Sequence, residues 1–150
     1  MNINSLLDDQ SIFIPLASND KNTIISDMID GLVSSGSVTD KEAYMNAVLT
    51  RESTGSTGIG FSVAIPHGKS PGVVKPGLAF AKLSTQADWQ SLDGEPVKVV
   101  FMIAVPEAAA GNEHLQILIA LSRKLIDSDF REQLMAVEQP EELKSLLAKI

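Results

Sequence analysis

The sequence predicts an α/β (α+β) fold: a single domain over residues 1–150, with helices flanking both faces of a central mixed β-sheet. Three observations predict it. Short apolar runs are typical of buried strands, amphipathic helical stripes precede and follow them, and no linker, repeat or low-complexity tract divides the chain. A chain of 150 residues is long enough for one domain with a substantial core.

The N-terminal part of the chain predicts an entry segment and one amphipathic helix. Residues 6–16 are typical of a short helix followed by a strand. Asn19 or Asp20 can cap the next helix, and Gly36 can close it. Apolar residues between these ends recur at three- and four-residue spacing, as in a helix that packs on a core. They are Ile24, Ile25, Met28, Ile29, Leu32 and Val33.

A second helix is predicted to extend to Arg51. Thr39 or Asp40 can cap it, and the spacing of Thr39 and Glu42 is that of a capping box. Residues 53–60, which follow, are rich in Gly, Ser and Thr. This composition is typical of a loop whose backbone approaches another group closely.

The apolar run at residues 61–65 predicts a buried strand that leads to a histidine. Pro66 has no N–H, so we expect it to end the hydrogen-bonded ladder. His67 then lies where a strand leaves the sheet, a common position for functional residues in α/β folds. A neutral imidazole there is a nucleophile and a base at physiological pH.

The second half of the chain predicts two more strands and three helices. Strands are expected at residues 78–83 and 97–105, with a turn at Asp93-Gly94 between them. Residues 69–77 are expected to form a turn that contains Pro and Gly. The second strand is apolar throughout, as in a strand buried on both faces.

Each of the three C-terminal helices has a start signal. Asn112 is predicted to cap a long helix, Asp129 a shorter one to Val137, and Pro140 opens the last at a first-turn position. One face of the long helix is expected to pack on the core. That face consists of Leu115, Leu118, Ile119, Ser122, Leu125 and Ile126.

Composition excludes several classes of function. The chain has no cysteine, which excludes disulfides, thiolate nucleophiles and cysteine metal sites, and fits a cytoplasmic protein. A net charge of −7 is not that of a nucleic-acid binder or of a protein attached to an anionic membrane, and it favours a partner with a basic surface. No signal peptide or membrane-spanning run is present, so we expect no membrane insertion.

Several familiar motifs match only in part. Residues 68–70 resemble the end of a P-loop, but Val63 stands where that loop needs glycine. Residues 58–60 begin a dinucleotide fingerprint but precede a predicted strand instead of following it. Ser62 lies inside an apolar run, not at the sharp turn of a nucleophile elbow. The two histidines lie far apart and not at a ligand spacing, so we expect no metal. Because the nucleotide-binding motifs also match only in part, we expect no cofactor.

Three residues remain as a candidate site: Arg51, His67 and His114. Arg51 offers a fixed charge for a phosphate-like group, and the start of a helix keeps His114 neutral and suits an anion. If the three converge, His67 can accept a phosphoryl group that the others stabilise. Each also has a structural alternative: a turn histidine, a surface histidine, and an arginine that complements a helix dipole.

Several separated blocks of the sequence are similar to those of a known family. The blocks are residues 51–60, 64–67, 91–96, 105–107 and 114–115. In this order they closely resemble the signature of the fructose/mannitol-type enzyme IIA (EIIA) domains of the bacterial sugar phosphotransferase system (PTS). The resemblance covers essentially the whole chain, and its family fold is a mixed sheet flanked by helices.

The resemblance implies a phosphocarrier. Such domains accept a phosphoryl group from the carrier protein HPr on the histidine that matches His67. They pass it to a cysteine of an enzyme IIB (EIIB) domain, which phosphorylates sugar as a membrane IIC component imports it. His114 matches the assisting histidine and Arg51 the family arginine. Two protein partners require an exposed, shallow cleft with an apolar rim. Candidates for this rim are Phe61, Ile59 and Val73, and packing in the core is the alternative role of each.

The same comparison leaves alternatives. Residues 92–96 and 106–107 favour the fructose branch over the nitrogen-regulatory branch, in which phosphorylation would gate a protein partner. A small hydrolase that uses Ser62 is a third hypothesis. Many members have Gly-Ile-Ala where this chain has residues 62–64, a change that could alter loop geometry beside the site. No IIB or IIC segment follows Ile150, so the chain is either freestanding or a piece of a larger protein.

Overall fold

A mixed six-stranded sheet forms the centre of the protein. The computed structural model describes residues 3–108 and 113–150, excluding the side chains of Glu113 and His114. The strands are β1 (Leu7–Leu16), β2 (Gly58–Gly60), β3 (Val63–Ala64), β4 (His67–Ser70), β5 (Gly77–Ala87) and β6 (Val97–Pro106). The helices are the short 3-10 helix η1 (Ile3–Leu6), α1 (Lys21–Ser34), α2 (Lys41–Thr54), α3 (Glu113–Leu125), α4 (Ser128–Met135) and α5 (Pro140–Leu147).

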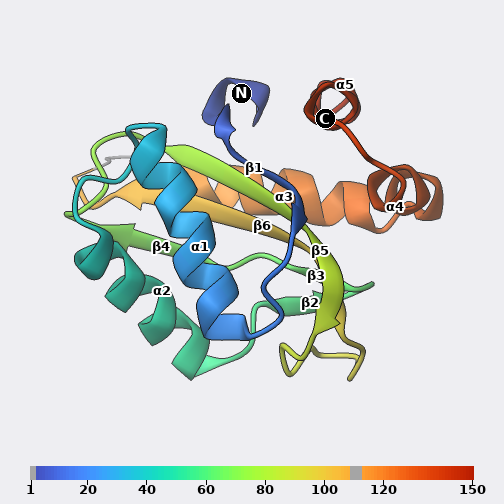
Figure 1. Cartoon of the computed structure of the whole chain (residues 1–150), viewed down its shortest axis with the longest axis horizontal. Coiled ribbons are helices and arrows are strands. Elements are labelled where there is room, and N and C mark those ends of the chain that lie inside the picture. The colour runs from blue at the N-terminus through green and yellow to red at the C-terminus, as the bar shows by residue number, and fades with distance from the viewer. Residues whose placement is uncertain (1–2, 109–112) are drawn as a thin grey trace.

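The strand order is β1-β5-β6-β3-β2, and β4 pairs with the second half of β6. β5 and β6 are antiparallel, as are β2 and β3, whereas β1 pairs parallel with β5 and both β3 and β4 pair parallel with β6. Helices α1 and α2 lie on one face of the sheet and α3 on the other (Figure 1). The predicted single domain with a mixed sheet between helices is therefore confirmed.

The two faces of the sheet bury two separate cores. Side chains alternate along a strand, so neighbours on β6 face opposite ways. Val100, Met102 and Ala104 pack with α1 and α2, whereas Phe101 and Ile103 pack with the C-terminal helices. Nearly every residue of β6 is buried, as its apolar run predicts.

Aspartate caps start three of the helices. Asp20 caps α1 and Asp40 caps α2, and each carboxylate accepts a hydrogen bond from a backbone N–H three residues on. Thr39, the alternative cap, lies outside α2. The expected cap at Asp129 is wrong, because the carboxylate of Asp127 binds the N–H of Asp129. Asn112 lies outside the described residues.

The predicted strand at residues 61–65 is wrong in its first half. Phe61 and Ser62 form a turn between β2 and β3, and their φ angles are 58° and 63°. Tertiary contacts hold this left-handed turn: the carboxylate of Asp93 accepts from the N–H of Phe61 at 3.1 Å. The guanidinium of Arg131 also lies 4.2 Å from the centre of the Phe61 ring. An apolar run carries no sign of such contacts.

The buried face of α3 also differs from the prediction. Ile117, Leu121 and Leu125 are buried, whereas Leu115 and Ile119 are about half exposed. Of the predicted face, Leu125 is buried and Leu118 packs against the core, so the prediction is right for these two residues. Apolar residues occur around most of this helix, so periodicity alone does not fix the buried face. Among the helices of the described residues, none has the length and apolar character needed to cross a membrane.

Candidate functional site

His67 is the first residue of β4, at an edge of the sheet. It pairs with Ile103 of β6, and the N–H of Ile103 donates to the carbonyl of Pro66 at 3.1 Å. The expectation that Pro66 ends the ladder is therefore wrong, because a proline that lacks an N–H still accepts through its carbonyl. The histidine remains anchored to the sheet through its backbone.

A hydrogen bond within the chain sets the tautomer of the imidazole. Nδ1 of His67 lies 2.9 Å from the carbonyl oxygen of Ile65. A carbonyl can only accept, so Nδ1 must be the donor and carry the proton. In the neutral ring Nε2 then holds the lone pair. The half-buried ring is thus oriented with Nε2 as its nucleophilic atom.

Helix α2 packs directly against β4 next to this histidine. A Cβ atom on Gly68 would lie 3.2 Å from the Cβ of Ala47 and from Val48, so glycine permits the close approach. The hydroxyl of Tyr44 donates to the carbonyl of Ile103 at 2.7 Å, which ties α2 to β6. Burial raises the pKa of Tyr44, so this donor stays protonated.

Arg51 occupies the last turn of α2. Its Nη1 donates to the carbonyl of Gly55 at 2.8 Å and to Oγ1 of Thr54 at 3.3 Å. These contacts complement the negative end of the helix, the structural alternative considered for this residue. A guanidinium has five N–H donors, so an arginine that caps a helix through Nη1 can also bind an anion.

Arg51 and His67 line the same surface hollow, which has a volume of about 430 Å³. The structure therefore brings together two of the three predicted site residues. The rest of the lining consists of Asn46, Ala47, Thr50, Gly68, Lys69 and Val105. For the third, His114, the backbone lies in the first turn of α3 and the side chain lies outside the described residues. Its convergence on His67 stays a prediction.

The predicted apolar rim is not the one observed. Val73 is buried, and Phe61 lines a different hollow together with Arg131. The apolar lining beside His67 comes from Ala47 and Val105. Ile59 packs against the core that the C-terminal helices cover.

Glu52, which follows Arg51 in the sequence, belongs to a group of four connected residues that sequence reasoning missed. This group, the Glu52 cluster, consists of Lys21, Glu52, Thr57 and Trp89. The Glu52 carboxylate pairs with Nζ of Lys21 at 2.9 Å and accepts from the N–H and the hydroxyl of Thr57. Nε1 of Trp89 donates to the Thr57 hydroxyl at 3.2 Å. No spacing rule links residues this far apart in the sequence.

The site offers charge and a nucleophile without a metal centre. Within residues 3–108 and the described part of 113–150, no group of three His, Cys, Asp or Glu side chains could hold a metal ion. Two hydrogen-bonding side chains on α2, Asn46 and Thr50, lie beside the two cations, Arg51 and Lys69. This arrangement suits a phosphate-like anion next to His67.

Comparison with known proteins gives a consistent result. Residues 5–150 match the family model described as "Phosphoenolpyruvate-dependent sugar phosphotransferase system, EIIA 2". The chain is 42% identical over 130 residues to a PTS system fructose-specific EIIA component of Haloferax volcanii, covering 87% of this chain and 84% of that protein. It is 39% identical over 147 residues to the PTS system fructose-specific EIIABC component of Bacillus subtilis, covering 98% of this chain but only 23% of that longer protein.

Solved structures share the same fold. The nitrogen regulatory protein IIA-Ntr of Neisseria meningitidis aligns with a TM-score of 0.84 and 30% identity, covering 97% of this chain and 98% of that one. The complex of enzyme IIAMTL and phosphorylated enzyme IIBMTL of Escherichia coli aligns with a TM-score of 0.81 and 28% identity, covering 96% and 98%. By its sequence and its fold, the chain belongs to the EIIA 2 family of the phosphoenolpyruvate-dependent sugar phosphotransferase system.

Proposed function

We propose that residues 1–150 act as a cytoplasmic phosphocarrier domain that receives a phosphoryl group on His67 from phosphorylated HPr and passes it to a cysteine of an EIIB domain. The observation that carries the proposal is the shared hollow, in which Arg51 lies beside an imidazole with an assigned tautomer. The likeness to the IIAMTL chain of a complex with phosphorylated IIBMTL supports an EIIB domain as the acceptor.

The proposed reaction is two displacements at phosphorus. Nε2 of His67 attacks the phosphoryl group on the carrier: the Nε2–P bond forms, the carrier's P–N bond breaks, and its electron pair returns to the carrier's ring. A cysteine thiolate then attacks, the S–P bond forms, and the pair of the broken Nε2–P bond returns to His67. Nδ1 keeps its proton throughout, and the Ile65 carbonyl stabilises the positive ring of the intermediate.

The neighbouring groups act on charge and position. Phosphoryl transfer depends mostly on alignment and on stabilising the charge of the phosphoryl oxygens. We assign Arg51 to those oxygens, because guanidinium N–H groups match them in geometry. We assign His114 an assisting hydrogen bond, since its backbone lies in the first turn of α3.

Fructose is the sugar we propose for the complete system. Two relatives, from Haloferax volcanii and Bacillus subtilis, are named fructose-specific. The sugar itself would meet the IIB and IIC components and not this chain. The Bacillus subtilis relative is more than four times as long as the segment that this chain matches, so sugar uptake belongs to the larger assembly.

The assignment of His67 is tested by following the phosphoryl group. Wild-type protein incubated with phosphorylated HPr should gain one acid-labile phosphoryl group by intact-mass spectrometry, and His67→Ala should gain none. His114→Ala should take it up more slowly at the same position. A His67→Ala variant that takes up phosphoryl groups at the wild-type rate would overturn the assignment.

A regulatory role is the second candidate. The likeness to nitrogen regulatory protein IIA-Ntr favours it, and a nitrogen regulatory protein of Bradyrhizobium diazoefficiens is 39% identical over 109 residues. In that case phosphorylated His67 would control binding to a protein partner and not feed an EIIB cysteine. The rate at which phosphorylated protein loses its phosphoryl group to a fructose-type EIIB domain distinguishes the transport role from the regulatory one. Only the transport role requires rapid transfer to the EIIB cysteine.

A further inference from the structure

We infer that Lys69 is a second cationic ligand of the phosphoryl group on His67, an inference that rests on the proposed phosphoryl transfer. His67 and Lys69 are two residues apart in β4, so their side chains leave the same face of the strand. Their Cα atoms are about 6.6 Å apart along it. Both line the hollow, as does Gly68 between them, which packs closely against α2.

The hollow has a charge opposite to that of the chain as a whole. Acidic residues outnumber basic ones by 19 to 12, yet among the described residues the lining contains Arg51 and Lys69 and no carboxylate. Lys21, Lys41 and Lys144 each pair with a carboxylate. Lys69 is exposed and forms no ion pair with any described carboxylate. Its ammonium is therefore available to an anion that enters the hollow.

A phosphoryl group needs more charge than Arg51 alone supplies. It brings a charge of about −2. Arg51 provides one positive charge and uses Nη1 to cap α2. A lysine on a flexible four-carbon stem can place a second charge on the opposite side of the phosphoryl oxygens. Arg51 and Lys69 together would neutralise the group and lower the repulsion of an incoming thiolate.

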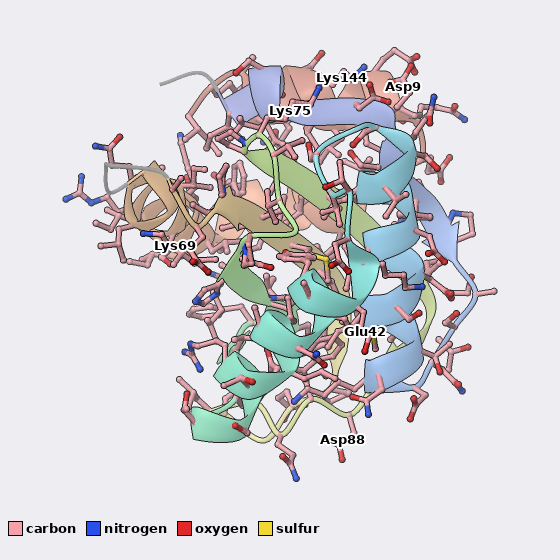
Figure 2. The ribbon with its side chains drawn as sticks, turned by 90° about the vertical axis from the view of Figure 1, so that its left-hand side faces the viewer. Asp9, Glu42, Lys69, Lys75, Asp88 and Lys144 are labelled. Carbon is pink, nitrogen blue, oxygen red and sulfur yellow. The ribbon has the colours of Figure 1, made fainter. Side chains whose placement is uncertain are left out.

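A small phosphoryl donor can show whether Lys69 contacts the phosphoryl group or a protein partner. Phosphoramidate carries a phosphoryl group but no protein surface. With it, Lys69→Ala should phosphorylate about tenfold more slowly than wild type, the effect of one lost charge-assisted contact. Lys69→Arg should recover most of the rate. Lys75→Ala is the matched control, because Lys75 is also exposed but does not line the hollow. Figure 2 shows the two lysines well apart.

A second measurement does not depend on phosphoryl transfer. Inorganic phosphate titrated into ¹⁵N-labelled protein should shift the amide signals of Gly68 and Lys69. Lys69→Ala should weaken this binding several-fold, and Lys75→Ala should not. In the phosphorylated protein, the ³¹P titration midpoint of the phosphoryl group should rise by about half a pH unit in Lys69→Ala, because a nearby cation is lost.

The outcomes separate this inference from the proposed function. If wild type binds phosphate through Lys69 but is never phosphorylated, the proposed function fails and the anion site stands. If Lys69→Ala slows transfer only from HPr, with normal phosphoramidate rate and ³¹P midpoint, Lys69 contacts the carrier protein and the inference is overturned. Equal behaviour of Lys69→Ala and Lys75→Ala, or no phosphate binding by wild type, overturns it as well.

Discussion

Arg51 and Glu52 are neighbours in the sequence, yet they belong to two different regions at the end of α2. Arg51 lines the open hollow beside His67. The side chain of Glu52 is only 5% exposed, and its carboxylate is bound by Lys21 and Thr57. Consecutive helical residues point about 100° apart, so one turn of helix can serve both regions.

The difference between the regions lies in where their hydrogen bonds go. In the Glu52 cluster the polar groups bind one another and close the loop after α2 against Trp89. In the hollow, the described lining contains cations and polar side chains but no carboxylate. Polar groups that bind one another hold the surrounding backbone rigidly. Cations that line a surface hollow can instead bind an anion. Mutations in the two regions should therefore affect different observables.

The largest effect on stability is expected in the cluster. Glu52→Ala leaves the Lys21 ammonium and the Thr57 hydroxyl without their acceptor, and breaking such a buried pair costs about 3 kcal/mol. Urea denaturation would measure the loss. Glu52→Gln keeps an acceptor for Thr57 and should lose less. A Glu52→Ala variant as stable as wild type would show that the cluster does not stabilise the fold.

The next effect should be on reactivity alone. Arg51→Ala should slow phosphorylation of His67 about 30-fold, or about 2 kcal/mol, because one charge-assisted contact to the phosphoryl group is lost. The free energy of unfolding should change by less than about 1 kcal/mol, since only an exposed helix-end contact disappears. Rate assays and denaturation on the same sample test this. A loss of stability equal to that of Glu52→Ala would erase the distinction between the regions.

A smaller effect is expected where α2 is attached to β6. Tyr44→Phe keeps the ring but leaves the Ile103 carbonyl without its donor, which should cost about 1 kcal/mol. The rate of His67 phosphorylation should fall only slightly, because Tyr44 lies in the core and not in the hollow. Thermal unfolding and the transfer assay measure the two. A rate loss as large as that of Arg51→Ala would place Tyr44 in the reacting site.

The same residue predicts a pH dependence. Burial raises the pKa of Tyr44, so the folded state keeps its proton while the unfolded state releases it above about pH 10. The unfolded state is then favoured, and stability should fall by about 1.4 kcal/mol per pH unit in that range. Tyr44 is the only tyrosine, so tyrosinate absorbance should rise only as the protein unfolds. Tyr44→Phe should not show this fall in stability, and ionisation of Tyr44 in the folded protein would contradict the prediction.

Local signals predicted most of the fold. Apolar stripes and the caps at Asp20 and Asp40 gave α1 and α2, and the run in β6 gave the central strand. The failures occur where tertiary contacts override local pattern. The turn at Phe61 and Ser62 depends on Asp93 and on Arg131, far along the chain. The buried face of α3 depends on which side chains of the sheet it packs against.

The site was predictable only in part for a similar reason. His67 and Arg51 carry chemistry that can be recognised in a sequence, and the structure brings them together. Lys69 could not be recognised in this way. It shares a face with His67 only because both belong to β4, and residues 69–77 were expected to form a turn. Glu52 needed the positions of Lys21 and Trp89, which only folding brings close.

The proposed chemistry depends on one atom, Nε2 of His67. The most direct test is ¹⁵N–³¹P coupling in phosphorylated protein with ¹⁵N-labelled histidine. We expect phosphorus bonded to Nε2, with Nδ1 still protonated and bound to the Ile65 carbonyl. Phosphorus on Nδ1 of His67, or on His114, would contradict it.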